Sequence, residues 1–144
     1  MTEILIDTNI LVYAVNTAAS HHEDARDFLR REYQQVVIAH QNILESLRVL
    51  THSTFPTPLS VNKTLKISED FSSTFRVISP KDETIFVFHE LIQKYSCVSN
   101  TIFDAYLVAT ALTNGITTIA TENERHFRIF KEITVLNPFT DLKN

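Results

Sequence analysis

The chain has 144 residues, 44% of them hydrophobic, and a net charge of −4. This composition is enough for one buried core, so we expect a single domain over residues 1–144. The acidic balance argues against a basic nucleic-acid coat, but it leaves open an enzyme that acts on nucleic acid. The single cysteine excludes an internal disulfide, and the single glycine excludes glycine-rich phosphate loops.

Short apolar runs alternate with helical patterns along the whole chain. An alternation of this kind predicts an α/β layer fold with a largely parallel sheet. We expect strands over residues 3–6, 36–39, 76–78, 116–120 and 133–136, and helices over residues 20–33, 41–51, 60–75, 80–95 and 101–113.

Three local signals set expected helix ends. Ser20 and Glu23 have the spacing of a capping box, which places the start of a helix at Ser20. Pro80 is expected at the first helical position of the helix that follows it. Asn114 and Gly115 have the form of a helix C-cap.

No segment has the pattern of a signal peptide or of a membrane span. None joins a basic flank to a long apolar core, and no apolar run approaches the ~18 residues that a spanning helix needs. The sequence therefore predicts a soluble, cytoplasmic protein.

Two aspartates stand where folding does not require an acid. Asp7 ends the first predicted strand, and in open α/β sheets ligands bind outside the carboxyl ends of the strands. The alternative is that Asp7 or Asn9 caps the next helix, and the two roles can coexist. Asp104 is the only charge in the apolar segment 102–112, so it is expected to be paired, protonated or bound to metal. A capping box with Thr101 is the alternative for Asp104.

Glu45 is a third acid of interest, although its sequence context is ordinary. It lies away from the predicted apolar stripe of its helix, so a solvated glutamate paired with Arg48 is the alternative. The polar segment 121–127 follows the fourth predicted strand and is expected at the same sheet edge as Asp7. His21 and His22 are expected to be a solvated helix start. The apolar stripe consists of Ile43, Leu44, Leu47 and Leu50.

Four segments in order resemble the motifs of PIN-domain nucleases. They are residues 4–10 (ILIDTNI), 41–45 (QNILE), 103–111 (FDAYLVATA), and 119–127 (IATENERHF) with the closing 136–139 (LNPF). The resemblance covers nearly the whole chain and is closest to the VapC-type toxins of bacterial toxin–antitoxin pairs. It implies a three-layer α/β/α fold with a central, mostly parallel sheet of four to five strands flanked by helices.

The same resemblance assigns roles to the acids. It implies that Asp7, Glu45 and Asp104 are the catalytic, metal-binding carboxylates for one or two Mg²⁺ or Mn²⁺ ions. Thr8 and Asn9 would orient Asp7. The family often has a further acid in the last motif, and here those positions hold Asn123 and His126. Asn123 offers a carbonyl oxygen but no charge, so a second metal would be held more weakly.

The reaction implied is hydrolysis of RNA phosphodiesters by a metal-activated water, giving 5′-phosphate and 3′-hydroxyl ends. Three close carboxylates repel one another, so activity should need metal and favour mildly alkaline conditions. Candidates for holding the RNA backbone, each with solvated surface charge as the alternative, are Arg48, Arg125, Arg128 and Lys131. The resemblance also implies a homodimer and a cognate antitoxin whose peptide fills the acidic cleft.

Two other functions are open at this point. One is a PIN-like scaffold that binds RNA or a partner with weak or no catalysis, and Asn123 is the residue that favours it. The other is a phosphatase with Asp7 as nucleophile, which usually needs a second aspartate where this chain has Asn9.

Overall fold

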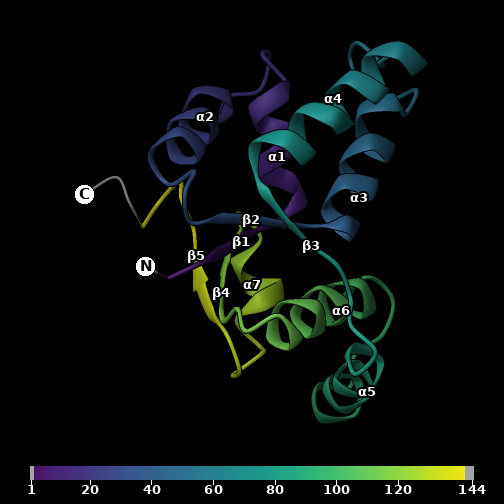
Figure 1. Ribbon diagram of the computed structural model, residues 1–144, viewed down its shortest axis with the longest axis vertical. Helices are drawn as coiled ribbons and strands as arrows, with labels where there is room; N and C mark the ends of the chain where they lie inside the picture. Colours follow the sequence, from purple (N-terminus) through teal and green to yellow (C-terminus); the bar gives the residue numbers. More distant parts are fainter. Residues whose placement is uncertain (1, 142–144) are drawn as a thin grey trace.

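The computed structural model describes residues 2–141. Its strands form one five-stranded sheet in the order β3-β2-β1-β4-β5, and every pairing among the described residues is parallel. Figure 1 shows helices on both sides of this sheet, which confirms the three-layer α/β/α fold. The elements are β1 (Ile4–Ile6), α1 (Thr8–Val15), α2 (His22–Arg31), β2 (Val36–Ala39), α3 (His40–Thr51), α4 (Val61–Thr74), β3 (Arg76–Ile78), α5 (Thr84–Tyr95), α6 (Asn100–Thr113), β4 (Thr118–Ala120), α7 (Glu124–Phe127) and β5 (Thr134–Leu136).

The strands β1 and β2 are buried along their whole length because each face of the sheet is covered there by helices. Successive side chains of a strand point to opposite faces, so Ile4 and Ile6 pack with α1, α2 and α4 while Leu5 packs with α5, α6 and α7. The two sets of buried side chains form separate cores above and below the sheet. Near-continuous apolar runs are typical of parallel strands buried in this way.

The order of the strands creates a crevice beside β1. From β1 the chain runs to β2 and β3 on one side, then returns to β4 on the other side. The connections after β1 and β4 therefore leave the same sheet edge in opposite directions. Open α/β sheets bind ligands at such a switch point. Asp7 and Thr121 are the residues that directly follow these two strands.

Two predicted helix starts are wrong. No capping bond from Ser20 is formed, and α2 begins at His22, whose Nδ1 lies 2.8 Å from the Tyr13 carbonyl oxygen. This contact ties the start of α2 to α1, and it makes His22 a buried residue and not the solvated one we expected. Pro80 is not at the first position of α5. The Thr84 hydroxyl accepts from the Lys81 N–H at 2.8 Å, which holds the intervening residues as a turn and delays the helix.

The predicted stripe of α3 is only partly right. Leu50 is buried, but Leu44 is 68% exposed. The Asn42 side-chain oxygen accepts from the Ala39 N–H at 2.8 Å, and this bond turns a polar face of α3 toward the protein. The buried residues of α3 are Asn42, Ser46 and Leu50.

The predicted end of α6 is confirmed. The helix ends at Thr113, Asn114 follows it as C-cap, and Gly115 has a φ of 75°. That left-handed conformation is the one in which glycine commonly ends helices. Within residues 2–141, no helix combines the length and the apolar character that crossing a membrane requires. One domain over 1–144 stays a prediction, since it includes Met1 and residues 142–144, which lie outside the described residues.

Candidate active site

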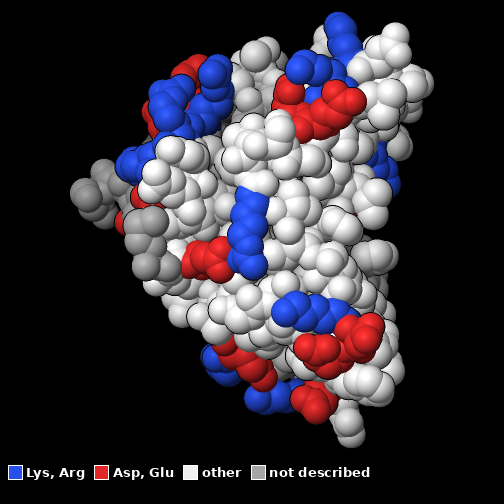
Figure 2. Space-filling model, viewed as in Figure 1, with Lys and Arg blue, Asp and Glu red and all other residues white. Residues whose placement is uncertain are grey.

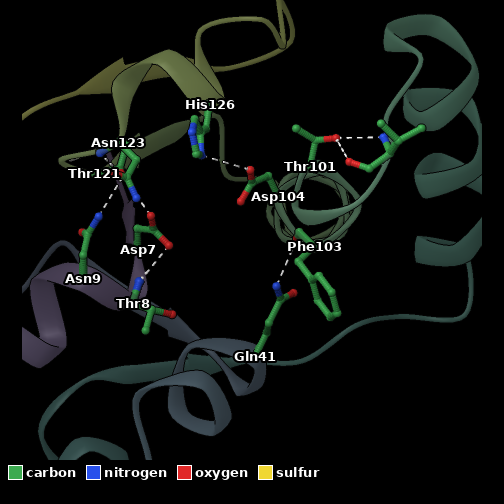
Figure 3. Close-up of polar contacts among 11 residues, drawn as sticks. Asp7, Thr8, Asn9, Gln41, Thr101, Phe103, Asp104, Thr121, Asn123 and His126 are labelled. Carbon is green, nitrogen blue, oxygen red and sulfur yellow. Dashed lines mark hydrogen bonds and ion pairs between the residues drawn. The ribbon is translucent and has the colours of Figure 1, made fainter. Parts of the chain in front are cut away.

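Asp7 is both a helix cap and a residue of the crevice. Its Oδ1 accepts from the Thr8 N–H at 2.8 Å, which makes it the N-cap of α1. Its Oδ2 accepts from the Thr121 hydroxyl at 2.8 Å (Figure 3). The two roles that the sequence left open therefore coexist, because each oxygen makes one of the two bonds.

Thr121 joins the loops on the two sides of the crevice. While its hydroxyl donates to Asp7, the same oxygen accepts from Asn9 Nδ2 at 3.4 Å and from the Asn123 N–H at 3.0 Å. Sequence reasoning placed Thr121 only within a polar segment and assigned it no role. The available signal was its position directly after an apolar strand, which matches that of Asp7 after β1.

Glu45 is held by polar groups of α1 and α3. Gln41 Nε2 donates to Glu45 Oε1 at 2.7 Å and to the Phe103 carbonyl at 3.0 Å, so this amide joins α3 to the start of α6. The Thr8 hydroxyl lies 3.5 Å from Glu45 Oε2. The alternative of a pair between Glu45 and Arg48 is wrong, since no ion pair joins them in the described structure.

Asp104 lies in the first half of α6, and its side chain is 20% exposed. Its Oδ2 atom is buried without a hydrogen-bond partner, and it lies 3.7 Å from His126 Nδ1. The capping-box alternative is wrong. The Thr101 hydroxyl accepts from the Val98 N–H, outside the helix, and not from the Asp104 N–H that a capping box requires. The helix is also less buried than its composition suggests, since Phe103 is 61% exposed.

The three acids line one hollow of about 320 Å³. They come from the end of β1, from α3 and from α6, which are far apart in the sequence. Figure 3 shows Asp7 beside Thr8 and Thr121, and Asp104 across an open space on α6. The lining residues are Asp7, Thr8, Asn9, Val12, Tyr13, Glu45, Val49, Asp104 and Asn123.

A second network, which sequence reasoning missed, fixes the loop after β4. The Tyr13 hydroxyl donates to Glu122 Oε2, and Glu122 Oε1 lies 3.3 Å from His21 Nε2. Burial and this hydrogen bond to Glu122 raise the pKa of Tyr13 to about 12. His21 stacks on Phe139 with ring centroids 4.2 Å apart, so it is not the solvated residue we expected. No spacing in the sequence indicated this network.

The predicted RNA-binding arginines lie outside the hollow. Arg48 lines a neighbouring hollow that shares Val49 with it, and Arg125 lines another that shares Asn123. Arg128 bonds Glu124 one turn earlier, and that hydrogen bond lowers the pKa of Glu124. The arrangement therefore leaves Arg48 and Arg125 nearer to the site than Arg128.

Burial and mutual repulsion raise the pKa of the aspartates. Burial raises the pKa of Asp7 above its ordinary value of 3.8, with a smaller contribution from the charge of Glu45, while bonds from Thr121 and Thr8 oppose the rise. Burial, followed by the charge of Asp7, raises the pKa of Asp104 to about 6. A site that disfavours its own negative charge in this way is one that a cation would stabilise.

The donor set fits a hard divalent ion that keeps part of its hydration. Among residues 2–141, no three Asp, Glu, His or Cys side chains lie close enough to enclose an ion as they stand. Mg²⁺, however, usually keeps several waters and is bound by one or two carboxylates. The oxygens Asp104 Oδ2 and Asn9 Oδ1 are buried without hydrogen-bond partners, so they have free capacity for an ion or its waters.

We expect Asp104→Asn to stabilise the metal-free protein above pH 6. A carboxyl whose pKa rises from 3.8 to about 6 on folding contributes stability that is full below 3.8 and is lost as the pH rises through 6. The neutral amide avoids that loss, which amounts to at most about 3 kcal/mol at pH 7.5. Urea unfolding in a chelator at pH 4 and pH 7.5 measures the difference between the two proteins. An equal difference at both pH values would contradict the raised pKa.

Solved structures with this fold come from several bacteria. VapBC2 of Rickettsia felis bound to promoter DNA matches with a TM-score of 0.71 and 18% identity, covering 94% of this chain and 98% of that one. FitAcB of Neisseria gonorrhoeae matches with a TM-score of 0.71 and 19% identity, covering 95% and 99%. VapC20 of Mycobacterium tuberculosis, described as a toxin that cleaves the sarcin–ricin loop, matches with a TM-score of 0.68 and 15% identity, covering 91% and 98%.

At these identities the solved structures show a shared fold. No curated protein matches the chain in sequence. A sequence model of the PIN domain matches residues 4–133, a span that includes Asp7, Glu45, Asp104 and the loop after β4. The chain belongs to the PIN domain family.

Proposed function

We propose that this chain is a metal-dependent endoribonuclease and the toxin of a bacterial toxin–antitoxin pair. The observation that carries the proposal is the convergence of Asp7, Glu45 and Asp104 on one hollow at the switch point of a PIN-domain sheet. The reaction is hydrolysis of an RNA phosphodiester in the cytoplasm, giving 5′-phosphate and 3′-hydroxyl ends.

Asp7 and Asp104 would hold the ion, with Glu45 completing the site and the Asn123 carbonyl oxygen as a further ligand. A bound Mg²⁺ or Mn²⁺ lowers the pKa of a coordinated water and neutralises charge that develops on the phosphate. One ion would be held by the three acids, and a second would depend on the uncharged Asn123.

Polar neighbours keep the carboxylates in position. Thr121 and the Thr8 N–H each bond one oxygen of Asp7, so its orientation is set before any ion binds. The Gln41 side-chain amide donates to one oxygen of Glu45 and so orients it. The same amide also donates to a backbone carbonyl of α6, which holds Gln41 in place. Partners that orient metal ligands typically contribute 10–100-fold to metal affinity. Asn9 orients Asp7 indirectly, because its side-chain amide donates a hydrogen bond to the Thr121 hydroxyl.

RNA is the substrate that the comparisons favour, since the similar VapC20 is described as cleaving the sarcin–ricin loop. On the face seen in Figure 2, basic and acidic side chains lie in small mixed groups and form no continuous basic tract. Arg48 and Arg125 line hollows next to the acidic one, so we expect local contacts from these two arginines to hold the RNA backbone. Arg128 is the weaker candidate because Glu124 already binds it.

A cognate antitoxin is the proposed protein partner, since similar structures include VapBC and toxin–antitoxin complexes. A second hollow, of about 560 Å³, lies between α1, α2 and α4 and suits an apolar segment of such a partner. The apolar residues of this second hollow are Ala14, Val15, Leu29, Ile67, Phe71 and Phe75.

We also propose that the chain forms a homodimer. Exposed apolar side chains on α5 and α6 support this proposal.

A PIN-like scaffold with weak or no catalysis is the second candidate. Asn123 stands where the family often has an acid, and the described acids do not yet enclose an ion. RNA binding without cleavage in both Mg²⁺ and Mn²⁺ would favour this function.

Cleavage of RNA by the purified protein tests the proposal. We expect cleavage in Mg²⁺ or Mn²⁺ and its loss in excess EDTA, with recovery when the ion is restored. Ligation of adapters that require a 5′-phosphate, followed by sequencing, identifies the ends. Cleavage that persists in EDTA, or products with 5′-hydroxyl ends, would contradict a metal-dependent mechanism.

A further inference from the structure

His126 lies beside Asp104 at the edge of the proposed metal site, and it is not among the acids proposed to hold the ion. We propose that His126 is a nitrogen ligand of the bound ion, and that it shifts the preference of the site from Mg²⁺ toward transition-metal ions such as Co²⁺. This inference rests on the proposed metal-dependent function and specifies which ion the site prefers.

The position of His126 is set by the short helix α7, which is held to the core by one buried side chain. α7 follows the loop that carries Thr121 and Asn123, and its Phe127 side chain is buried in the core below the sheet. His126, one residue earlier, is directed to α6, where its Nδ1 lies 3.7 Å from Asp104 Oδ2 (Figure 3). The imidazole is otherwise more than half exposed, so core packing does not account for its orientation.

The contact between His126 and Asp104 is too long for a hydrogen bond and close to the spacing of two ligands of one ion. Nitrogen–oxygen hydrogen bonds fall at about 2.7–3.2 Å. Two donors at about 2.1 Å from a tetrahedral ion are about 3.4 Å apart, which is a few tenths of an ångström less than the observed 3.7 Å. Asp104 Oδ2 is also buried without a hydrogen-bond partner. An ion bound by both His126 Nδ1 and Asp104 Oδ2 would therefore supply the partner that this oxygen lacks.

The chemistry of the donors determines the preference. Carboxylates, carbonyls and water suit Mg²⁺, whereas imidazole suits Zn²⁺, Fe²⁺, Ni²⁺ and related ions. A neutral imidazole also adds no negative charge to the site, and charge is what a hard ion such as Mg²⁺ needs most. An ion position that pairs Asp104 with an imidazole should thus discriminate against Mg²⁺ more strongly than one that pairs it with a second acid.

A competing role for His126 makes the opposite prediction. A protonated imidazole could serve as a fixed positive charge for Asp104 and so occupy the place of the ion. Removing it would then strengthen the binding of every divalent cation. Direct ligation predicts a loss that is confined to ions that favour nitrogen.

The test is calorimetric titration of Co²⁺ and, separately, Mg²⁺ into the metal-free, full-length protein and its variants. We expect His126→Ala to weaken Co²⁺ binding at least about tenfold, since even residues that only orient ligands contribute 10–100-fold, and to leave Mg²⁺ binding nearly unchanged. His126→Asp should strengthen Mg²⁺ binding relative to Co²⁺. Spin-echo modulation by ¹⁴N in Mn²⁺-loaded protein should be present and should disappear in His126→Ala.

His89→Ala is the matched control, because it removes an exposed imidazole from α5 and should change neither affinity. Circular dichroism and thermal unfolding show that each variant folds. An unchanged Co²⁺ to Mg²⁺ ratio in His126→Ala, or stronger binding of both ions, would overturn the inference while RNA cleavage and its loss in EDTA still support the proposed function. Failure of the unsubstituted protein to bind either ion would overturn both.

Discussion

Replacing Asp104 by asparagine is expected to lower the rate of RNA cleavage about a thousandfold or more. The amide keeps the shape of the side chain but removes the charge that we propose holds the ion on the α6 side of the hollow. Metal ions supply several kcal/mol of transition-state stabilisation, and each 1.36 kcal/mol corresponds to about tenfold in rate. Asp7→Asn should have a similar effect from the β1 side. Single-turnover cleavage of a defined RNA, with growth of cells that express each variant, measures both.

Asp82→Asn is the matched control for these variants. Asp82 is exposed, it lies before α5, and it does not line the hollow, so its substitution should leave cleavage and growth arrest unchanged. Loss of fold does not explain inactivity of Asp104→Asn, because the metal-free variant is expected to be more stable than the parent near neutral pH. Undiminished cleavage or growth arrest in the two site variants would rule out the proposed site.

Phe127→Ala is expected to destabilise the protein by about 3–5 kcal/mol. Phe127 is almost fully buried in the core below the sheet, and its removal leaves a cavity that the short helix α7 cannot close without moving. A loss of this size is a large part of the 5–15 kcal/mol that stabilises a typical domain. Because α7 also carries His126, the cavity should weaken Co²⁺ binding as well. Chemical denaturation followed by circular dichroism gives the free energy of unfolding.

Phe86→Ala is the matched control for Phe127→Ala, because it makes the same replacement at an exposed position. Phe86 is 67% exposed on α5, so its removal should change the free energy of unfolding by no more than about 0.5 kcal/mol. A similar loss for both variants would show that burial of Phe127 contributes little, and that α7 is held by its loops instead.

Most of the elements could be predicted from local pattern. The strands β2 and β3 have the predicted bounds, and the other three differ by one or two residues at their starts. Strong apolar runs between helical segments leave few alternatives, because buried parallel strands and their covering helices have different periods. Helix starts were less accurate, since polar contacts that no capping pattern indicated decided them. His22 lies against the Tyr13 carbonyl oxygen, and the Thr84 hydroxyl accepts from the Lys81 N–H.

The three acids could be named from the sequence, but their surroundings could not. Motif resemblance singled out Asp7, Glu45 and Asp104, and the structure brings them to one hollow. The sequence offered no way to see that Thr121 bonds Asp7 across the switch point, or that Gln41 joins Glu45 to α6. Thr121 and Asp7 are 114 positions apart in the sequence, and Gln41 and Phe103 are 62 positions apart, so no local pattern could indicate either bond.

The amino-acid sequence by itself indicated the layered α/β fold through its hydrophobic pattern, and the resemblance of its motifs pointed to the family and to the three acids proposed for the site. Only the tertiary structure decided what each acid touches, how its pKa shifts, and that His126 lies 3.7 Å from Asp104. The physical reason is that burial, charge and hydrogen bonding depend on distances between segments, and those distances exist only after the strands pair in the order β3-β2-β1-β4-β5.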